Sequence, residues 1–199
     1  MTMGAPGMNR VPDLRIHAVL DRPARASQDY VLYWMTSYRR ATWNFSLQRA
    51  VEWAVQLGKP LVVLEALRCG YPWASDRIHQ FTIQGMADTS AVLARKRVFY
   101  YPYVEPALEA GKGLLAALAA RSAVVISDDF PCFFLPRMYR AAASQIPVRF
   151  ELVDSNGILP LRAATKVFAR AVDFRRFLQK NLRDHLEQYI RLAVGNLLA

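Results

Sequence analysis

Five short, strongly apolar runs of β-favouring residues, separated by stretches of helical periodicity, constrain this 199-residue chain most. Most of these runs are apolar on both faces, as strands must be when helices cover both sides of their sheet. Strands that alternate with helices at this spacing form right-handed βαβ units and a parallel sheet. We therefore predict strands at Tyr30–Met35, Leu61–Ala66, Arg97–Pro102, Ala123–Ser127 and Val148–Val153.

The stretches between these runs predict helices. Apolar residues recur there at helical spacing, Gly58 is a typical stop signal, and the pair Ser75-Asp76 is a typical start. We expect helices at Asn44–Leu57, Ser75–Arg95, Gly113–Ala120 and Phe133–Ser144, and a long final helix from Ala171. The fold class is therefore α/β, an open three-layer sandwich around a five-stranded parallel sheet, plus a C-terminal helix.

We assign the predicted sandwich to residues 28–160, a partly disordered N-terminal extension to residues 1–27, and a linker and terminal helix to residues 161–199. One side of the terminal helix carries Phe174, Phe177, Leu178 and Tyr189, and the other side carries several arginines and a lysine. Two interpretations of such a helix remain open. It closes the edge of the sandwich, or it begins a second domain.

The composition narrows the function classes. The net charge is +10 and 21 of the 26 cationic residues are arginine, which favours polyanions and phosphate contacts. A GC-rich genome that encodes Arg in place of Lys is the alternative, and the arginines are scattered along the chain, which argues against a nucleic-acid binder. Neither a signal peptide nor a membrane span is visible, so we expect a cytoplasmic protein without membrane contacts. The two cysteines and three histidines lack metal-ligand spacing.

Ligands of open parallel sheets bind outside the carboxyl ends of the strands. After the predicted strands the chain offers aromatic rings and a few charges, and it lacks a Gly-rich phosphate loop. Flat rings of this kind suit a planar aromatic ligand, although the same rings could simply pack the helix layers. Asp128 and Asp129 close the fourth strand. They could share a proton as acid and base, or one of them could cap the following helix.

Several motifs, taken in order, resemble a known family. They read "YVLYWM", "YRRATWNFSLQRAVEWA", "GKPLVVLEALRCGYPWASDRIHQF", "DDFPCFFLPRM" and "VDSNGILPLRAA". Together they resemble the N-terminal α/β domain of class II cyclobutane-pyrimidine-dimer DNA photolyases, from about Leu14 to Lys180. In that family this domain is a five-stranded Rossmann-like sandwich. A larger helical domain follows, which binds FAD and splits thymine dimers by light-driven electron transfer.

The resemblance also implies a site for a second, light-harvesting (antenna) chromophore, a deazaflavin or a folate. Arg77 would pair with its anionic ring system and Trp73 would cover its face. A solvent-facing position in the first helical turn is the alternative for Arg77. The antenna-binding positions implied are Arg39, Glu65, Ala66, Leu67, Trp73, Arg77, Asp128, Asp129 and Phe130; no catalytic or metal-binding residue is expected.

The family's FAD contacts and dimer pocket lie in the helical domain, which we expect to be missing from this chain. The chain is then an isolated domain, the product of a truncated gene or a free-standing paralogue. The resemblance implies an antenna or scaffold domain of a light-dependent DNA-repair lyase, inactive alone, with no firmly expected cofactor and contact with damaged DNA only in the full-length enzyme. The alternative is a stand-alone small-ligand-binding or protein-docking module. We also expect an exposed apolar patch at Phe168, Phe174, Phe177, Leu178 and Tyr189, and a homodimer that covers it.

Overall fold

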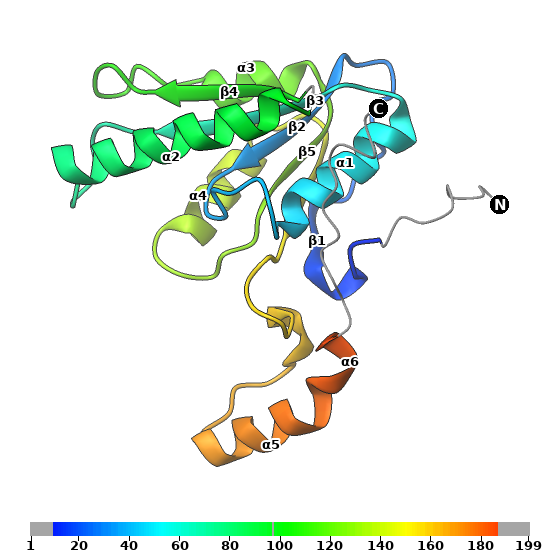
Figure 1. Cartoon of the computed structure of the whole chain (residues 1–199). Coiled ribbons are helices and arrows are strands. Elements are labelled where there is room, and N and C mark those ends of the chain that lie inside the picture. The colour runs from blue at the N-terminus through cyan, green and yellow to red at the C-terminus, as the bar shows by residue number, and fades with distance from the viewer. Residues whose placement is uncertain (1–9, 97, 187–199) are drawn as a thin grey trace.

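A six-stranded sheet lies between two layers of helices in the computed structural model, which describes residues 10–96 and 98–186 (Figure 1). The order of the strands across the sheet is β1-β6-β5-β2-β3-β4. The strands are β1 (Ile16–Leu20), β2 (Tyr30–Met35), β3 (Leu61–Leu67), β4 (Phe99–Val104), β5 (Ser122–Asp128) and β6 (Arg149–Val153). The predicted three-layer α/β fold is confirmed.

Helices connect the parallel strands and cover the two faces of the sheet (Figure 1). They are α1 (Phe45–Leu57), α2 (Asp76–Ala94), α3 (Leu114–Ala120) and α4 (Leu135–Ala143). Two further helices, α5 (Ala171–Asn181) and α6 (Arg183–Leu186), follow the last strand, and short 3-10 turns lie at η1 (Asp13–Arg15) and η2 (Leu161–Ala163). The predicted start of α2 has a visible cause, because the Ser75 side chain accepts a hydrogen bond from the amide of Ile78. Gly58 ends α1 in the left-handed conformation, with φ of 61°.

The prediction of five strands was wrong by one. All five predicted strands are present and parallel to one another, but β1 adds an antiparallel edge beside β6. β1 lies inside the segment that we assigned to an N-terminal extension. Its side chains are only half-buried and include the exposed His17, so it lacks the continuous apolar run of a strand covered on both faces.

The core is divided by the sheet into two apolar clusters, and alternate side chains of β2 point into each. Val31 and Tyr33 pack with residues of α1 and α2 on one face. Leu32 and Trp34 pack with residues of α3 and α4 on the other. This two-sided burial is the physical reason why β2 is an uninterrupted apolar run in the sequence.

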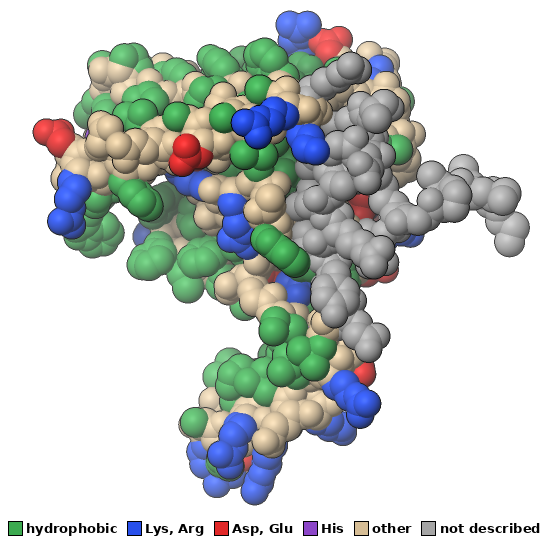
Figure 2. Space-filling model, viewed as in Figure 1, with side chains coloured by type: hydrophobic (Ala, Val, Ile, Leu, Met, Phe, Trp, Pro, Cys, Tyr) green, Lys and Arg blue, Asp and Glu red, His purple; other side chains and the backbone are tan. Residues whose placement is uncertain are grey.

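The last described segment extends away from the sandwich (Figure 1). Within it, the rings of Phe168, Phe174 and Phe177 pack on one another with centroids 5.0–6.5 Å apart. Phe174 remains 42% exposed, whereas Phe168, Phe177 and Leu178 are half-buried. The fifth residue of the predicted patch, Tyr189, lies outside the described residues. Figure 2 shows hydrophobic side chains on the side of this segment nearer the sandwich and Lys and Arg side chains at its outer edge.

Candidate functional site

The strand order reverses between β2 and β5, which are neighbours at the centre of the sheet. From β2 the chain moves outward through β3 and β4 on one side, and from β5 through β6 on the other. The loops that follow β2 and β5 therefore begin at the same point of the carboxyl edge. In open α/β sheets this is the place where a ligand binds.

The Asp128 carboxylate fills this place. Its Oδ2 atom accepts hydrogen bonds from three consecutive backbone amides in the turn after β2: Thr36 at 2.9 Å, Ser37 at 2.7 Å and Tyr38 at 2.9 Å. Successive amides that converge on one anion form a nest, the arrangement that phosphate-binding loops use. Here the anion belongs to the protein, so the turn needs no glycine and holds no external phosphate.

The other oxygen of this carboxylate is also occupied. Asp128 Oδ1 accepts a hydrogen bond of 2.8 Å from the Tyr33 hydroxyl, which in turn accepts one of 2.9 Å from Asn44 Nδ2. Burial raises the pKa of Tyr33 well above its usual value, and the negative charge of Asp128 adds to the shift. Asp128 is itself fully buried. It therefore holds the turn and α1, which Asn44 caps, rather than facing a ligand.

The structure supports neither of the two roles that we considered for Asp128 and Asp129, a shared proton and a cap on the following helix. The two carboxylates face different partners, because Asp129 Oδ2 accepts a hydrogen bond of 2.8 Å from Arg162. The following helix, α4, begins without any side-chain cap. The prediction that one aspartate caps this helix was therefore wrong, since the β2 turn takes the carboxylate of Asp128 instead.

A second polar cluster lies beside the first, where β3 ends. Arg39 lies 3.5 Å from the Glu65 carboxylate and donates a hydrogen bond of 3.1 Å to the Ala66 carbonyl. The Tyr100 hydroxyl donates one of 2.7 Å to the other Glu65 oxygen. The structure thus brings together Arg39, Glu65 and Ala66 of the predicted site, and the next residue, Leu67, is buried.

Glu65 should make stability depend on pH. Burial raises the pKa of Glu65, and this outweighs the hydrogen bond from Tyr100 and the charge of Arg39, which lower it. The folded state then holds the Glu65 proton to higher pH than the unfolded state, so stability falls as the pH rises above the unfolded pKa of about 4.3. We expect Glu65→Gln to remove this fall, measured as the free energy of unfolding in urea between about pH 4 and 8.

The control for this measurement is Asp88→Asn, which neutralises an exposed carboxylate on α2. Asp88→Asn should leave the pH profile of the wild type almost unchanged. A difference between Glu65→Gln and wild type that stays constant across the pH range would contradict the assignment.

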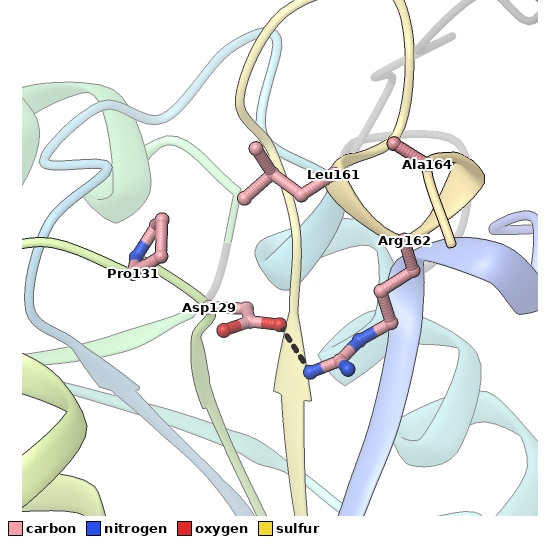
Figure 3. Close-up of a pocket in the computed structure, with 5 residues that line it drawn as sticks. All are labelled: Asp129, Pro131, Leu161, Arg162 and Ala164. Atoms are coloured by element: carbon pink, nitrogen blue, oxygen red, sulfur yellow. Dashed lines mark hydrogen bonds and ion pairs between the residues drawn. The ribbon is translucent and has the colours of Figure 1, made fainter. Parts of the chain in front are cut away.

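Asp129 and Arg162, which are joined by their hydrogen bond, line an open pocket of about 360 Å³ (Figure 3). The lining residues are Asp129, Pro131, Leu161, Arg162 and Ala164. Partial loss of solvent lowers the pKa of the nearby His17, which stays largely exposed, and the positive charge of Arg162 lowers it further. Sequence reasoning missed Leu161, Arg162 and Ala164, because residues 158–168 lack periodicity; the only signal was the motif "VDSNGILPLRAA" itself.

The remaining predicted residues are more dispersed. The ring of Phe130 lies edge-on to Tyr38, with centroids 6.2 Å apart. Trp73 is 74% exposed. Arg77 is exposed in the first turn of α2, which agrees with the alternative of a solvent-facing position. Among the described residues, no hydrogen bond, ion pair or ring contact joins Trp73 or Arg77 to the other predicted positions. The predicted site is therefore not a single closed cavity.

Two further aromatic residues at this edge have unusual backbones. Trp43, in the loop after β2, has φ of 52°, and Phe133, in the loop after β5, has φ of 59°. Bulky residues rarely adopt such angles, and both side chains are largely exposed. Strained backbone with exposed rings is typical of a contact surface, and Phe134 beside Phe133 is exposed as well.

The described residues bear on two kinds of feature, a cluster of metal ligands and a membrane-spanning helix. No group of three or more His, Cys, Asp or Glu side chains in residues 10–96 and 98–186 is placed to hold a metal ion. Over the same residues, no helix is both long enough and apolar enough to cross a membrane.

Comparisons with known proteins give a distant relative. No protein-family model matches the chain. The chain is 28% identical over 136 residues to the deoxyribodipyrimidine photo-lyase of Methanothermobacter thermautotrophicus. The match covers 68% of this chain but only 30% of that protein. This similarity supports a relation to photolyases, and the chain corresponds to less than a third of its relative's length.

A solved structure of a protein from the universal stress protein family, from Burkholderia pseudomallei, also resembles the chain. It has 17% sequence identity and a TM-score of 0.38, and the match covers 62% of this chain and 96% of that protein. Similarity at this level supports no functional inference.

Proposed function

We propose that this chain is an antenna or scaffold domain related to photolyases, which holds a planar light-harvesting chromophore at the carboxyl edge of its sheet. The supporting observation is the sequence similarity to a photolyase, which covers 136 residues and 68% of this chain. The α/β fold is compatible with the proposal. The chemistry of DNA repair would belong to a separate FAD-binding helical domain, and we assign no catalytic step to the described residues.

The side chains at the end of β3 and the start of α2 fit a planar anion better than a phosphate. Arg39 is one-third exposed, so its guanidinium can face a ligand while Glu65 holds it from behind. Arg77 has no carboxylate within ion-pair distance among the described residues, and Trp73 offers an exposed ring face. Asp128 would contribute indirectly, because both of its oxygens are already hydrogen-bonded and it fixes the turn that carries Arg39.

A chromophore titration tests this function. The full chain is titrated with a free deazaflavin and, separately, with a folate, and binding is followed by the change in chromophore fluorescence. We expect a deazaflavin to bind and Arg77→Ala to weaken that binding by about tenfold, the effect of losing one charge-assisted contact. The matched control is Arg95→Ala, an exposed arginine that follows the other end of α2, and it should bind as the wild type does.

Two results would overturn the proposal. One is wild-type protein that binds neither chromophore at millimolar concentration. The other is FAD bound at stoichiometric occupancy by this chain alone, since the proposal places FAD in another domain.

A protein-docking module is the second candidate, and the exposed, strained rings of Trp43 and Phe133 favour it. Such rings could also form the contact to a helical domain, so the two candidates share this surface. Sedimentation of the purified chain distinguishes self-association from a surface that needs a different partner. A homodimer through the apolar side of α5 remains a prediction that the same experiment addresses.

A further inference from the structure

Half of the net charge of the protein lies in one segment. Residues 161–186, here called the basic segment, contain seven Arg and Lys side chains and two Asp side chains. Their net charge of +5 compares with +10 for all 199 residues. The sequence suggested scattered arginines, but in the fold only the start of this segment, where Arg162 binds Asp129, contacts the sandwich, and the remainder extends away from it (Figure 1).

Three of these cations share one side of a helix. Arg176, Lys180 and Arg183 follow the spacing i, i+4 and i+7, which places them on one face over about 10 Å. The break between α5 and α6 does not disturb this spacing, because Leu182 keeps a right-handed helical conformation, with φ of −66° and ψ of −34°. Arg175 borders the same face.

These cations are exposed and have no partner among the described residues. Arg175, Arg176, Lys180 and Arg183 are all exposed, and no carboxylate in residues 10–96 or 98–186 lies within ion-pair distance of them. Arg170 differs, because Asp173 holds it with a contact of 2.9 Å. The face therefore presents a net positive charge to the solvent, with Asp173 and Asp184 at its border.

The opposite side of the helix is occupied by packing. Phe174 and Phe177 lie there with Leu178, and both rings pack against Phe168 from the preceding loop. Figure 2 shows this division, with hydrophobic side chains toward the sandwich and Lys and Arg side chains at the outer edge. A membrane-binding helix would insert its apolar side into lipid. Here both rings of that side already pack against Phe168, although Phe174 stays 42% exposed, and the opposite face offers charge alone.

We propose that the face formed by Arg176, Lys180 and Arg183, with Arg175 at its border, binds the phosphate backbone of duplex DNA without reading its sequence. Guanidinium groups make strong hydrogen bonds to phosphate, and each neutralised phosphate releases counterions. The positive charge alone predicts a polyanion. The choice of DNA among polyanions rests on the proposed relation to a DNA-repair protein.

The test measures binding of the full chain to a labelled, undamaged duplex of about 20 base pairs by fluorescence anisotropy at several salt concentrations. The test variant is Arg176→Ala/Lys180→Ala/Arg183→Ala. The control is Arg95→Ala/Arg137→Ala/Arg140→Ala, which removes the same charge from exposed positions at the end of α2 and on α4. We expect the test variant to bind at least about tenfold more weakly and to reduce the slope of log K against log salt by about 2–3. The control should change affinity by less than about threefold.

Four outcomes would overturn the proposal. They are wild-type protein that does not bind the duplex, equal losses in the two triple variants, tighter binding to vesicles that contain phosphatidylserine than to the duplex, and binding to an RNA duplex in preference to DNA. Circular dichroism of both variants checks that they remain folded. The chromophore titration is independent of this result: its failure would remove the antenna function while the dependence of DNA binding on this face would stand.

Discussion

Replacing Asp128 with alanine should lower the free energy of unfolding by about 3–5 kcal/mol, one of the two largest effects that we expect from any single substitution. The change leaves three consecutive amides, those of Thr36, Ser37 and Tyr38, without their acceptor. It also removes the acceptor of the Tyr33 hydroxyl. Buried donors that lose their partner incur their full desolvation penalty. Urea denaturation followed by circular dichroism measures the loss.

The neighbouring residue supplies the control. Asp129→Ala removes a carboxylate whose partner, Arg162, is 41% exposed, so it should cost no more than about 1 kcal/mol. Asp128→Asn should fall between the two alanine variants, because it keeps one oxygen acceptor but loses the charge. If Asp128→Ala proved no less stable than Asp129→Ala, the carboxylate would not be what organises the turn after β2.

Arg15→Met should cost about 2–4 kcal/mol, the second large effect. The Arg15 side chain is 1% exposed and donates hydrogen bonds to the carbonyls of Asp154 at 3.2 Å, Gly157 at 3.2 Å and Ile158 at 2.6 Å. It also lies over the ring of Phe45, 4.2 Å from the centroid. Methionine fills much of the same volume but donates nothing, so three carbonyls and the Asp154 carboxylate lose their cation.

Hydrogen exchange should localise this second effect. The Asp154 carboxylate accepts hydrogen bonds from the amides of Asn156 and Leu161, at 2.7 and 2.6 Å, and thereby shapes the loop that leads to the basic segment. We expect these two amides to exchange faster in Arg15→Met than in the wild type. Arg15→Lys keeps the charge but not the branched donor group and should lie between the two. Unchanged exchange in a fully stable Arg15→Met would show that the loop is held by other contacts.

The central strands were predictable because burial on both faces leaves a direct record in the sequence. β2 was predicted with its observed bounds, Tyr30–Met35, β3 with an error of one residue at one end, and β5 with an error of one residue at each end. β4 is an edge strand with several exposed residues, and its prediction was displaced by two residues. β1 was not predicted at all, since an edge strand that is only half-buried does not need a continuous apolar run.

The site was predictable only in its location. The rule for parallel sheets predicts a ligand site at the ends of β2, β3 and β5, and the structure brings Arg39, Glu65 and Ala66 together there. It could not predict the role of Asp128. The partners of this carboxylate are backbone amides about 90 positions earlier in the chain, and almost any residue type supplies an amide. Arg162 was missed for a related reason. It belongs to a loop without periodicity, and only the folded chain brings it next to Asp129.

The buried carboxylate in the turn after β2 also restricts how this fold could evolve. A glycine-rich loop introduced there would not by itself create a nucleotide-binding protein, because an incoming phosphate would meet a negative charge already seated among the same amides. Removing Asp128 first would leave an intermediate of low stability, and adding the new loop first would leave one without affinity. We therefore expect the two mutations to be epistatic, and a ligand of a chain that carries this aspartate to bind beside the turn.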